Sequence, residues 1–123
     1  MKPEDVIVAG PLRTIAHARD ARGRAHARAF LDIECPRKDH SRLHHWFDVI
    51  AHMGERASNR EGFRHEAGPI HAFKSAEARV ATFRVANTWL LTHGFIKKRD
   101  RWRAAEIRRA ERIRAEHMAR EGM

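Results

Sequence analysis

The residue types best suited to chemistry lie at the end of one apolar run. Residues 89–96 read Trp-Leu-Leu-Thr-His-Gly-Phe-Ile, and Lys97 and Lys98 follow them directly. Two neighbouring runs of β-type composition carry Lys74, Arg79 and Arg84. Within one sheet these cations would converge, as the binding of a phosphate backbone or of a phosphoryl transition state requires. The sequence therefore predicts a phosphate site at the end of this strand, with a rim of solvated cations as the alternative.

Other constellations that often carry chemistry are weak. His40, His44, His45 and His52 lie close together in the sequence, but no HExxH motif is present and no carboxylate has a conventional ligand spacing. We therefore interpret them as surface or interface histidines and expect no metal. Cys35 is the single cysteine, which excludes an internal disulfide and a cysteine-rich zinc site. GxxxxGK[ST] and GxGxxG are missing, so no nucleotide cofactor is expected.

Net charge is the strongest compositional signal. The chain carries 25 Lys and Arg against 16 Asp and Glu, which gives +9 and a pI near 11.1. More than half of this excess follows residue 96, where ten basic and five acidic side chains remain. A charge of this size attracts polyanions before any specific contact forms. Nucleic acid is the first expected partner and an acidic protein the second, while a merely solvated Arg/Glu surface is the alternative.

Length and hydropathy favour one cytoplasmic domain that covers residues 1–123. A chain of 123 residues suits one domain with a modest core. No apolar run approaches the roughly 20 residues of a membrane-spanning helix. The first residues, Met-Lys-Pro-Glu-Asp, place acids where a signal peptide has basic residues, and no long apolar segment follows. We therefore expect a cytoplasmic protein that makes no contact with a membrane.

Several predicted elements must position the cations. Apolar residues at helical spacing predict helices over residues 24–34, 41–53 and 102–120. Strands are predicted over residues 6–9, 12–17, 70–74, 79–85 and 88–97, the last three joined as hairpins, and a polar loop over residues 55–69. The order β, α, α, β, β, β, α predicts an α+β fold. We expect a small antiparallel sheet of three to four strands, with an N-terminal helical hairpin and a C-terminal helix.

Four segments carry a resemblance to a known family. They are His71-Ala72-Phe73-Lys74, Ala78-Arg79-Val80, residues 91–98 (Leu-Thr-His-Gly-Phe-Ile-Lys-Lys), and Ala105-Glu106-Ile107 with Ala110. Through them the chain resembles the RelE/ParE superfamily of bacterial toxins, within it the HigB-like and phage-derived toxins, in which a strand ends in HGF-x-KK and an E-I-x-x-A helix follows. Residues 22–31 and 43–54 are similar to the family's first two helices.

The resemblance implies a RelE-like fold and the toxin of a two-gene toxin–antitoxin pair. Many members bind in the ribosomal A site and cleave mRNA there without metal, through attack of a ribose 2′-OH on the adjacent phosphate. By position, the family's basic residues correspond to Lys74, Arg79, Lys97 and Lys98. His93 lies at the same strand end, and an ordinary pKa near 6.5 suits it to proton transfer, with His71 as the second candidate.

The resemblance also implies partners. They are the ribosome with its mRNA, and a cognate antitoxin of helix-turn-helix type that lays an acidic segment over the basic face. No cofactor is implied. Further contacts to nucleic acid are expected from His71, Arg84, Arg99, Arg101 and Arg103.

Two departures leave the reaction open. The chain has no tyrosine, and it has Arg101-Trp102-Arg103 where the family commonly has Thr-Pro. Some relatives act on DNA gyrase and cleave no RNA, and a fold alone does not decide the reaction. The alternatives to a ribosome-dependent endoribonuclease are therefore a gyrase-directed toxin and a non-catalytic, basic nucleic-acid-binding module.

Overall fold

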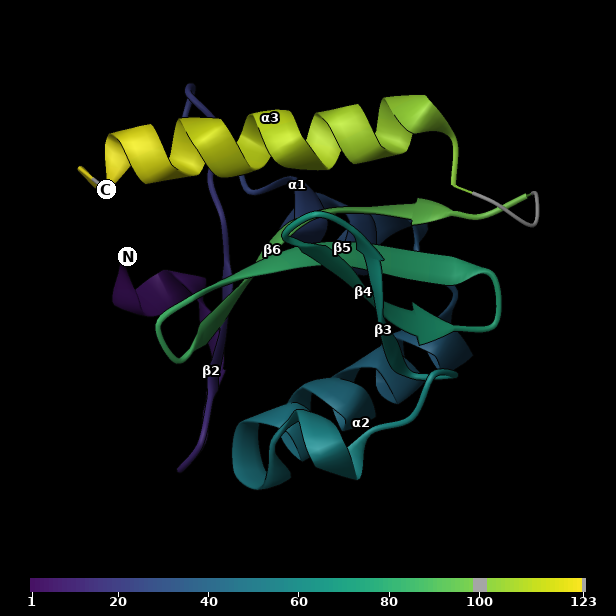
Figure 1. The fold of residues 1–123 in the computed structure, drawn as a ribbon. Helices are drawn as coiled ribbons and strands as arrows, with labels where there is room; N and C mark the ends of the chain where they lie inside the picture. Colours follow the sequence, from purple (N-terminus) through teal and green to yellow (C-terminus); the bar gives the residue numbers. More distant parts are fainter. Residues whose placement is uncertain (99–101, 123) are drawn as a thin grey trace.

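A six-stranded sheet with helices on both faces forms the centre of the computed structural model, which describes residues 1–98 and 102–122 (Figure 1). The strands are β1 (Val6–Ala9), β2 (Thr14–His17), β3 (Phe63–Ala67), β4 (Ile70–Ser75), β5 (Ala78–Val85) and β6 (Thr88–Ile96). The helices are α1 (His26–Ala29), α2 (Arg37–Met53) and α3 (Ala104–Arg120), with a π turn η2 (Phe30–Glu34) and 3-10 turns η1 (Pro3–Asp5) and η3 (Glu55–Ala57). Helices α1 and α2 cover one face, and α3 covers the other.

The sheet is mixed, with the strand order β1-β2-β6-β5-β4-β3. Strand β2 runs parallel to β6, with Thr14 opposite Thr88 and His17 opposite Leu91. The other neighbouring strands are antiparallel. A parallel pair needs a long connection, and here α1, η2, α2 and the strands β3 to β5 provide it. Among the described residues, no helix combines the length and the apolar character needed to cross a membrane.

The expected antiparallel sheet of three to four strands behind an N-terminal helical hairpin is wrong, and with it the expected RelE-like arrangement. The sheet has six strands, because β1, β2 and β3 join the three predicted hairpin strands, and it is mixed, because β2 pairs in parallel with β6. Residues 55–69, expected as a loop, contain β3 at the edge of the sheet. Only Phe63 of β3 is buried, so an edge strand that is mostly polar lacks the alternating pattern by which strands are recognised.

The larger core layer lies between α2 and the sheet. Leu43, Phe47 and Ile50 recur at spacings of three and four and are fully buried. Phe47 meets Phe73 of β4 edge to face, with the ring centroids 4.7 Å apart. Burial of each such side chain contributes roughly 1.5–3 kcal/mol. Met53, the last residue of α2, is 64% exposed.

The layer beneath α3 is thinner. Ala110 and Ile113 are its fully buried helix residues, and they pack with Phe83 and Leu90 of the sheet. The guanidinium carbon of Arg114 lies 5.7 Å from the centroid of the Phe83 ring, which is a cation–π contact. A small apolar seam therefore holds a helix whose remaining surface is charged.

Gly94 allows the ring of Phe30 to lie directly on β6. A Cβ atom at Gly94 would lie 2.1 Å from a ring carbon of Phe30, so Gly94→Ala displaces the ring. We expect this substitution to lower the free energy of unfolding by about 1–3 kcal/mol, measured by denaturant unfolding. Gly68→Asn is the control, because an added Cβ meets nothing within 4 Å there and Asn tolerates a φ of +52°. Equal losses in the two variants would contradict this account.

Candidate nucleic-acid interface

Basic side chains gather on the α3 face of the sheet, where β4 turns into β5. Lys74 lies directly opposite Arg79, and Arg79 lies opposite Phe95 of β6. Side chains alternate along a strand, so these three share a face, and Arg64 of β3 belongs to it as well. The backbone N–H of Lys97 donates to a carbonyl of the β4–β5 turn at 2.7 Å. The end of β6 is thereby fixed beside the cations.

Lys74 shows that this cluster carries excess positive charge. Its Nζ donates to a backbone carbonyl at 3.0 Å. Burial lowers the pKa of Lys74, and the charges of Arg79, Arg64 and Lys97 lower it further. The neighbouring carboxylate, Glu66, is already paired with Arg64 at 2.9 Å. An anion bound here relieves this repulsion, so the cluster favours negatively charged ligands.

A hollow of about 180 Å³ lies beside this cluster, at the end of β6. We call it the β6-end hollow; its lining is Phe95, Ile96, Lys97, Lys98, Trp102, Arg103 and Glu106. The rings of Phe95 and Trp102 meet edge to face, with their centroids 4.8 Å apart. Within residues 1–98 and 102–122, Lys97, Lys98 and Arg103 form no ion pair with a carboxylate. Free cations beside aromatic rings are the combination with which proteins bind single-stranded nucleic acid.

Arg79 is held inside the β4–β5 hairpin. It is 6% exposed, and its Nη1 donates to the carbonyls of Ala76 and Ala78. Ala76 has a φ of +50° in the turn, a conformation that costs energy for a residue with a Cβ atom. Burial also lowers the pKa of Arg79. The structure thus places Arg79 beside the predicted phosphate site, with its guanidinium engaged in support of the turn.

His93 is buried beneath α3. It is 0% exposed, and its Nε2 lies 3.2 Å from Oε1 of Glu106. A carboxylate only accepts hydrogen bonds, so Nε2 donates. Burial lowers the pKa of His93 to about 3, and the positive charge of Arg109 acts in the same direction. The ring is therefore neutral near pH 7, and it fixes Glu106 at the wall of the hollow instead of meeting a ligand.

His71 and Arg84, both predicted to contact nucleic acid, lie away from this hollow. His71 stacks on Phe63, and Arg84 lies opposite Trp89, which places both on the α2 face of the sheet. They line a second cavity at the opposite end of the strands. Of the other three arginines predicted to contact nucleic acid, Arg103 is exposed at the hollow directly before α3. The other two, Arg99 and Arg101, lie outside the described residues.

Four residues of the hollow were not predicted as functional: Phe95, Ile96, Trp102 and Glu106. A sequence signal exists for the two aromatic residues, because they are interleaved with basic residues between positions 95 and 103. Glu106 has no such signal, since its position depends on the packing of α3 against His93. Aromatic residues interleaved with basic residues in a sequence therefore indicate a binding site as well as the lysine pair does.

Comparisons with known proteins do not assign a family. No protein-family model matches this chain, and no curated protein matches it. Function therefore has to be argued from the geometry and the charge of the site.

The buried histidines predict a loss of stability toward acid. His93 and His17 have pKa values lowered by burial to about 3 and about 4. Between their ordinary value near 6.5 and these values, the unfolded chain binds protons that the folded chain does not, so the free energy of unfolding falls as the pH falls. His93→Gln keeps a donor for Glu106 and removes one of these titrations. We expect a shallower slope between about pH 7 and pH 5, by at most about 1.4 kcal/mol per pH unit.

Denaturant unfolding at several pH values measures this slope. The matched control is His52→Gln at an exposed position of α2. We expect its free energy of unfolding to depend on pH with the same slope as that of the parent protein. A slope that is the same for His93→Gln and for the parent would contradict the burial of a neutral His93.

Proposed function

We propose that the β6-end hollow binds single-stranded RNA, and that the chain acts as a cytoplasmic toxin that cleaves ribosome-bound mRNA and is held in check by an antitoxin. The observation that carries the proposal is the hollow itself. It is lined by the contacting rings of Phe95 and Trp102 and by Lys97, Lys98 and Arg103, which form no ion pair with a carboxylate of the described residues. The resemblance of residues 91–98 to the toxin segment supports the choice of RNA and of the reaction.

A single strand fits this hollow better than a duplex does. A base can stack on an aromatic ring only when it is free of its own helix, and each such stack is worth about 1–3 kcal/mol. Lys97 and Lys98 lie beside the rings, where the phosphates of a strand with a stacked base pass. Lys74 extends the positive charge onto the neighbouring strand. The hollow thus offers a place for one base and a track for the backbone.

Cleavage needs a base for the 2′-OH and positive charge for the phosphate. Glu106 lines the hollow, and the N–H of His93 holds its carboxylate in place. In the proposed step the 2′-oxygen attacks the adjacent phosphorus while its proton passes to Glu106. The bond from phosphorus to the 5′-oxygen breaks, the leaving oxygen takes a proton from Lys97 or Lys98, and a 2′,3′-cyclic phosphate results. Arg79 supports this site by holding the neighbouring hairpin.

A non-catalytic RNA-binding module is the second candidate. Two residues expected to take part in the reaction, Arg79 and His93, are engaged inside the fold. This observation favours a protein that binds RNA without cleaving it. The two candidates share the hollow and differ only in the role of Glu106, so they are separated by what happens to bound RNA.

RNA binding is tested with Lys97→Ala combined with Lys98→Ala. We expect at least a tenfold weaker affinity for a fluorescent single-stranded RNA of about 12 nucleotides, and a shallower dependence of the affinity on salt, because two phosphate contacts are lost. Lys38→Ala with Arg42→Ala on exposed positions of α2 removes the same charge at a distance. Equal losses in both double variants would show that net charge alone attracts the RNA.

Cleavage is tested with Glu106→Gln, which keeps the shape of the side chain and removes the proposed base. We expect this variant to bind the same RNA with unchanged affinity and to lose growth arrest when expressed in cells without an antitoxin. New 5′ ends inside translated codons, mapped after induction of the parent protein, support the nuclease. Intact mRNA with a DNA-damage response indicates a gyrase-directed toxin, and intact mRNA without any phenotype indicates the binding module.

A further inference from the structure

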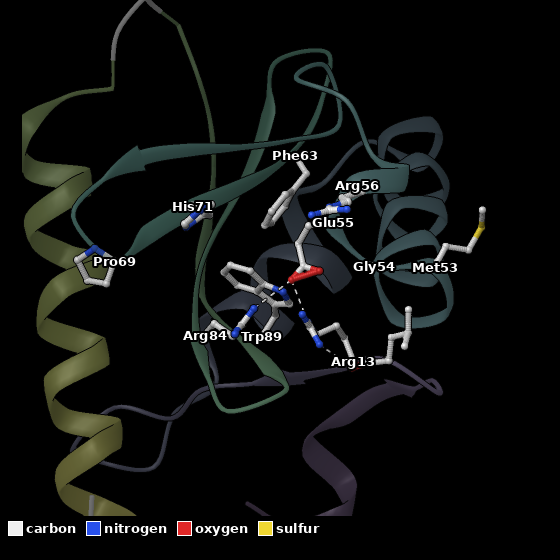
Figure 2. Close-up of a pocket in the computed structure, with 11 residues that line it drawn as sticks. Arg13, Met53, Gly54, Glu55, Arg56, Phe63, Pro69, His71, Arg84 and Trp89 are labelled. Carbon is white, nitrogen blue, oxygen red and sulfur yellow. Dashed lines mark hydrogen bonds and ion pairs between the residues drawn. The ribbon is translucent and has the colours of Figure 1, made fainter.

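A second and larger cavity lies at the opposite end of the sheet from the β6-end hollow. It has a volume of about 730 Å³ and opens between the end of α2, η3 and the start of β2 (Figure 2). Its floor is formed by Phe63, His71 and Trp89, whose rings contact one another at centroid distances of 5.0 to 5.4 Å. A cavity of this size with an aromatic floor is within the range of natural binding sites.

The floor contains two polar groups without a well-formed hydrogen bond. Trp89 is 4% exposed, and its indole N–H can only donate. It interacts with the Glu55 carboxylate, but the contact falls short of a good hydrogen bond. Nδ1 of His71 is buried beside Trp89 in the same cavity, likewise without a well-formed hydrogen bond. Because Glu55 already serves Trp89, the floor offers a ligand its aromatic surface and not a free donor.

The wall of the cavity is positively charged around one carboxylate. Glu55 accepts from Arg13 at 2.9 Å and lies 3.3 Å from Arg84, as the dashed lines in Figure 2 show. Arg56 is exposed on the same wall. Three arginines thus stand against one glutamate, and Glu55 leaves them with an excess of positive charge. An acidic ligand group fits this wall, provided that it does not have to displace Glu55.

The rim of the cavity is apolar. Leu12 is 47% exposed and Met53 is 64% exposed, and both line the opening. Five large hydrophobic side chains are exposed among the residues that the structure describes, so two of the five stand at this one opening. Aliphatic side chains at a rim, with arginine and tryptophan behind them, have the composition of an anchor pocket in a protein–protein interface.

We propose that this cavity binds a short acidic segment of a partner protein, with one apolar side chain anchored between Leu12 and Met53. The peptide backbone supplies donors for Glu55, and flanking Asp or Glu residues pair with Arg56 and Arg84. A nucleotide meets these demands less well, because the apolar rim of Leu12 and Met53 finds no counterpart on it. The segment binds far from Lys97 and Lys98, so the cavity is independent of the proposed RNA site.

The probe is a phage-displayed library of random linear peptides of about 12 residues, selected against the folded, immobilised protein. We expect the enriched sequences to share one apolar residue flanked by Asp or Glu. A synthetic peptide of the enriched sequence should shift the indole N–H resonance of Trp89 in ¹⁵N-labelled protein. Trp46→Phe and Trp102→Phe assign that resonance among the three tryptophans.

Surface variants then locate the bound peptide. Arg84→Glu and Met53→Asp change exposed residues of the cavity, and each should weaken binding at least tenfold. Ile33→Asp and Arg42→Glu make the same kinds of change at exposed positions outside the cavity and should bind as the parent does. Lys97→Ala with Lys98→Ala should also keep full peptide binding, whether or not the RNA proposal holds.

Several results would overturn the proposal. They are a library that yields no enrichment, enriched peptides without acidic residues, and binding that Arg84→Glu and Met53→Asp leave unchanged. A shift of the Trp89 resonance by uridine monophosphate, with none by the selected peptides, would assign the cavity to nucleotides instead.

Discussion

The parallel pairing of β2 with β6 is the constraint on which the rest of the structure depends. It makes β6 a central strand, with β2 on one side and β5 on the other. A parallel connection must cross a face of the sheet, so the helices between β2 and β3 cover one face and leave the other to α3. Residues of β6 consequently serve both layers, Leu91 on the α2 side and Leu90 on the α3 side.

Local periodicity predicts the elements of this fold better than it predicts their assembly. The stripe of Leu43, Phe47 and Ile50 lies within α2, and residues 70–97 form three strands close to the expected positions. The mixed sheet could not be read from these patterns, because the residues of β2 meet β6 only through contacts far apart in the sequence. β2 also contains Ala16 and His17, which are poor strand formers, and β6 compensates by pairing with them.

The sequence predicts which face of the sheet each candidate residue lies on, because side chains alternate between the two faces along a strand. Lys74 and His71 stand on one strand three positions apart, so they face opposite sides of the sheet, and this separation follows from geometry alone. Burial does not follow from it. His93 and Arg79 have suitable residue types at suitable positions, but α3 and the β4–β5 turn enclose them. Whether a cation or a histidine meets solvent depends on packing that no single segment contains.

Both ends of the sheet hold more cations than carboxylates. Elsewhere the chain pairs its buried carboxylates closely, as Asp5 does with Arg19 at 2.6 Å and Asp20 with His26 at 2.7 Å. At the β4–β5 end, Lys97, Lys98 and Arg103 form no ion pair with a carboxylate of the described residues. At the other end, Arg13, Arg56 and Arg84 stand around the single carboxylate of Glu55. Because cations held close together repel one another, an anionic ligand that binds at either end gains affinity from the relief of this repulsion.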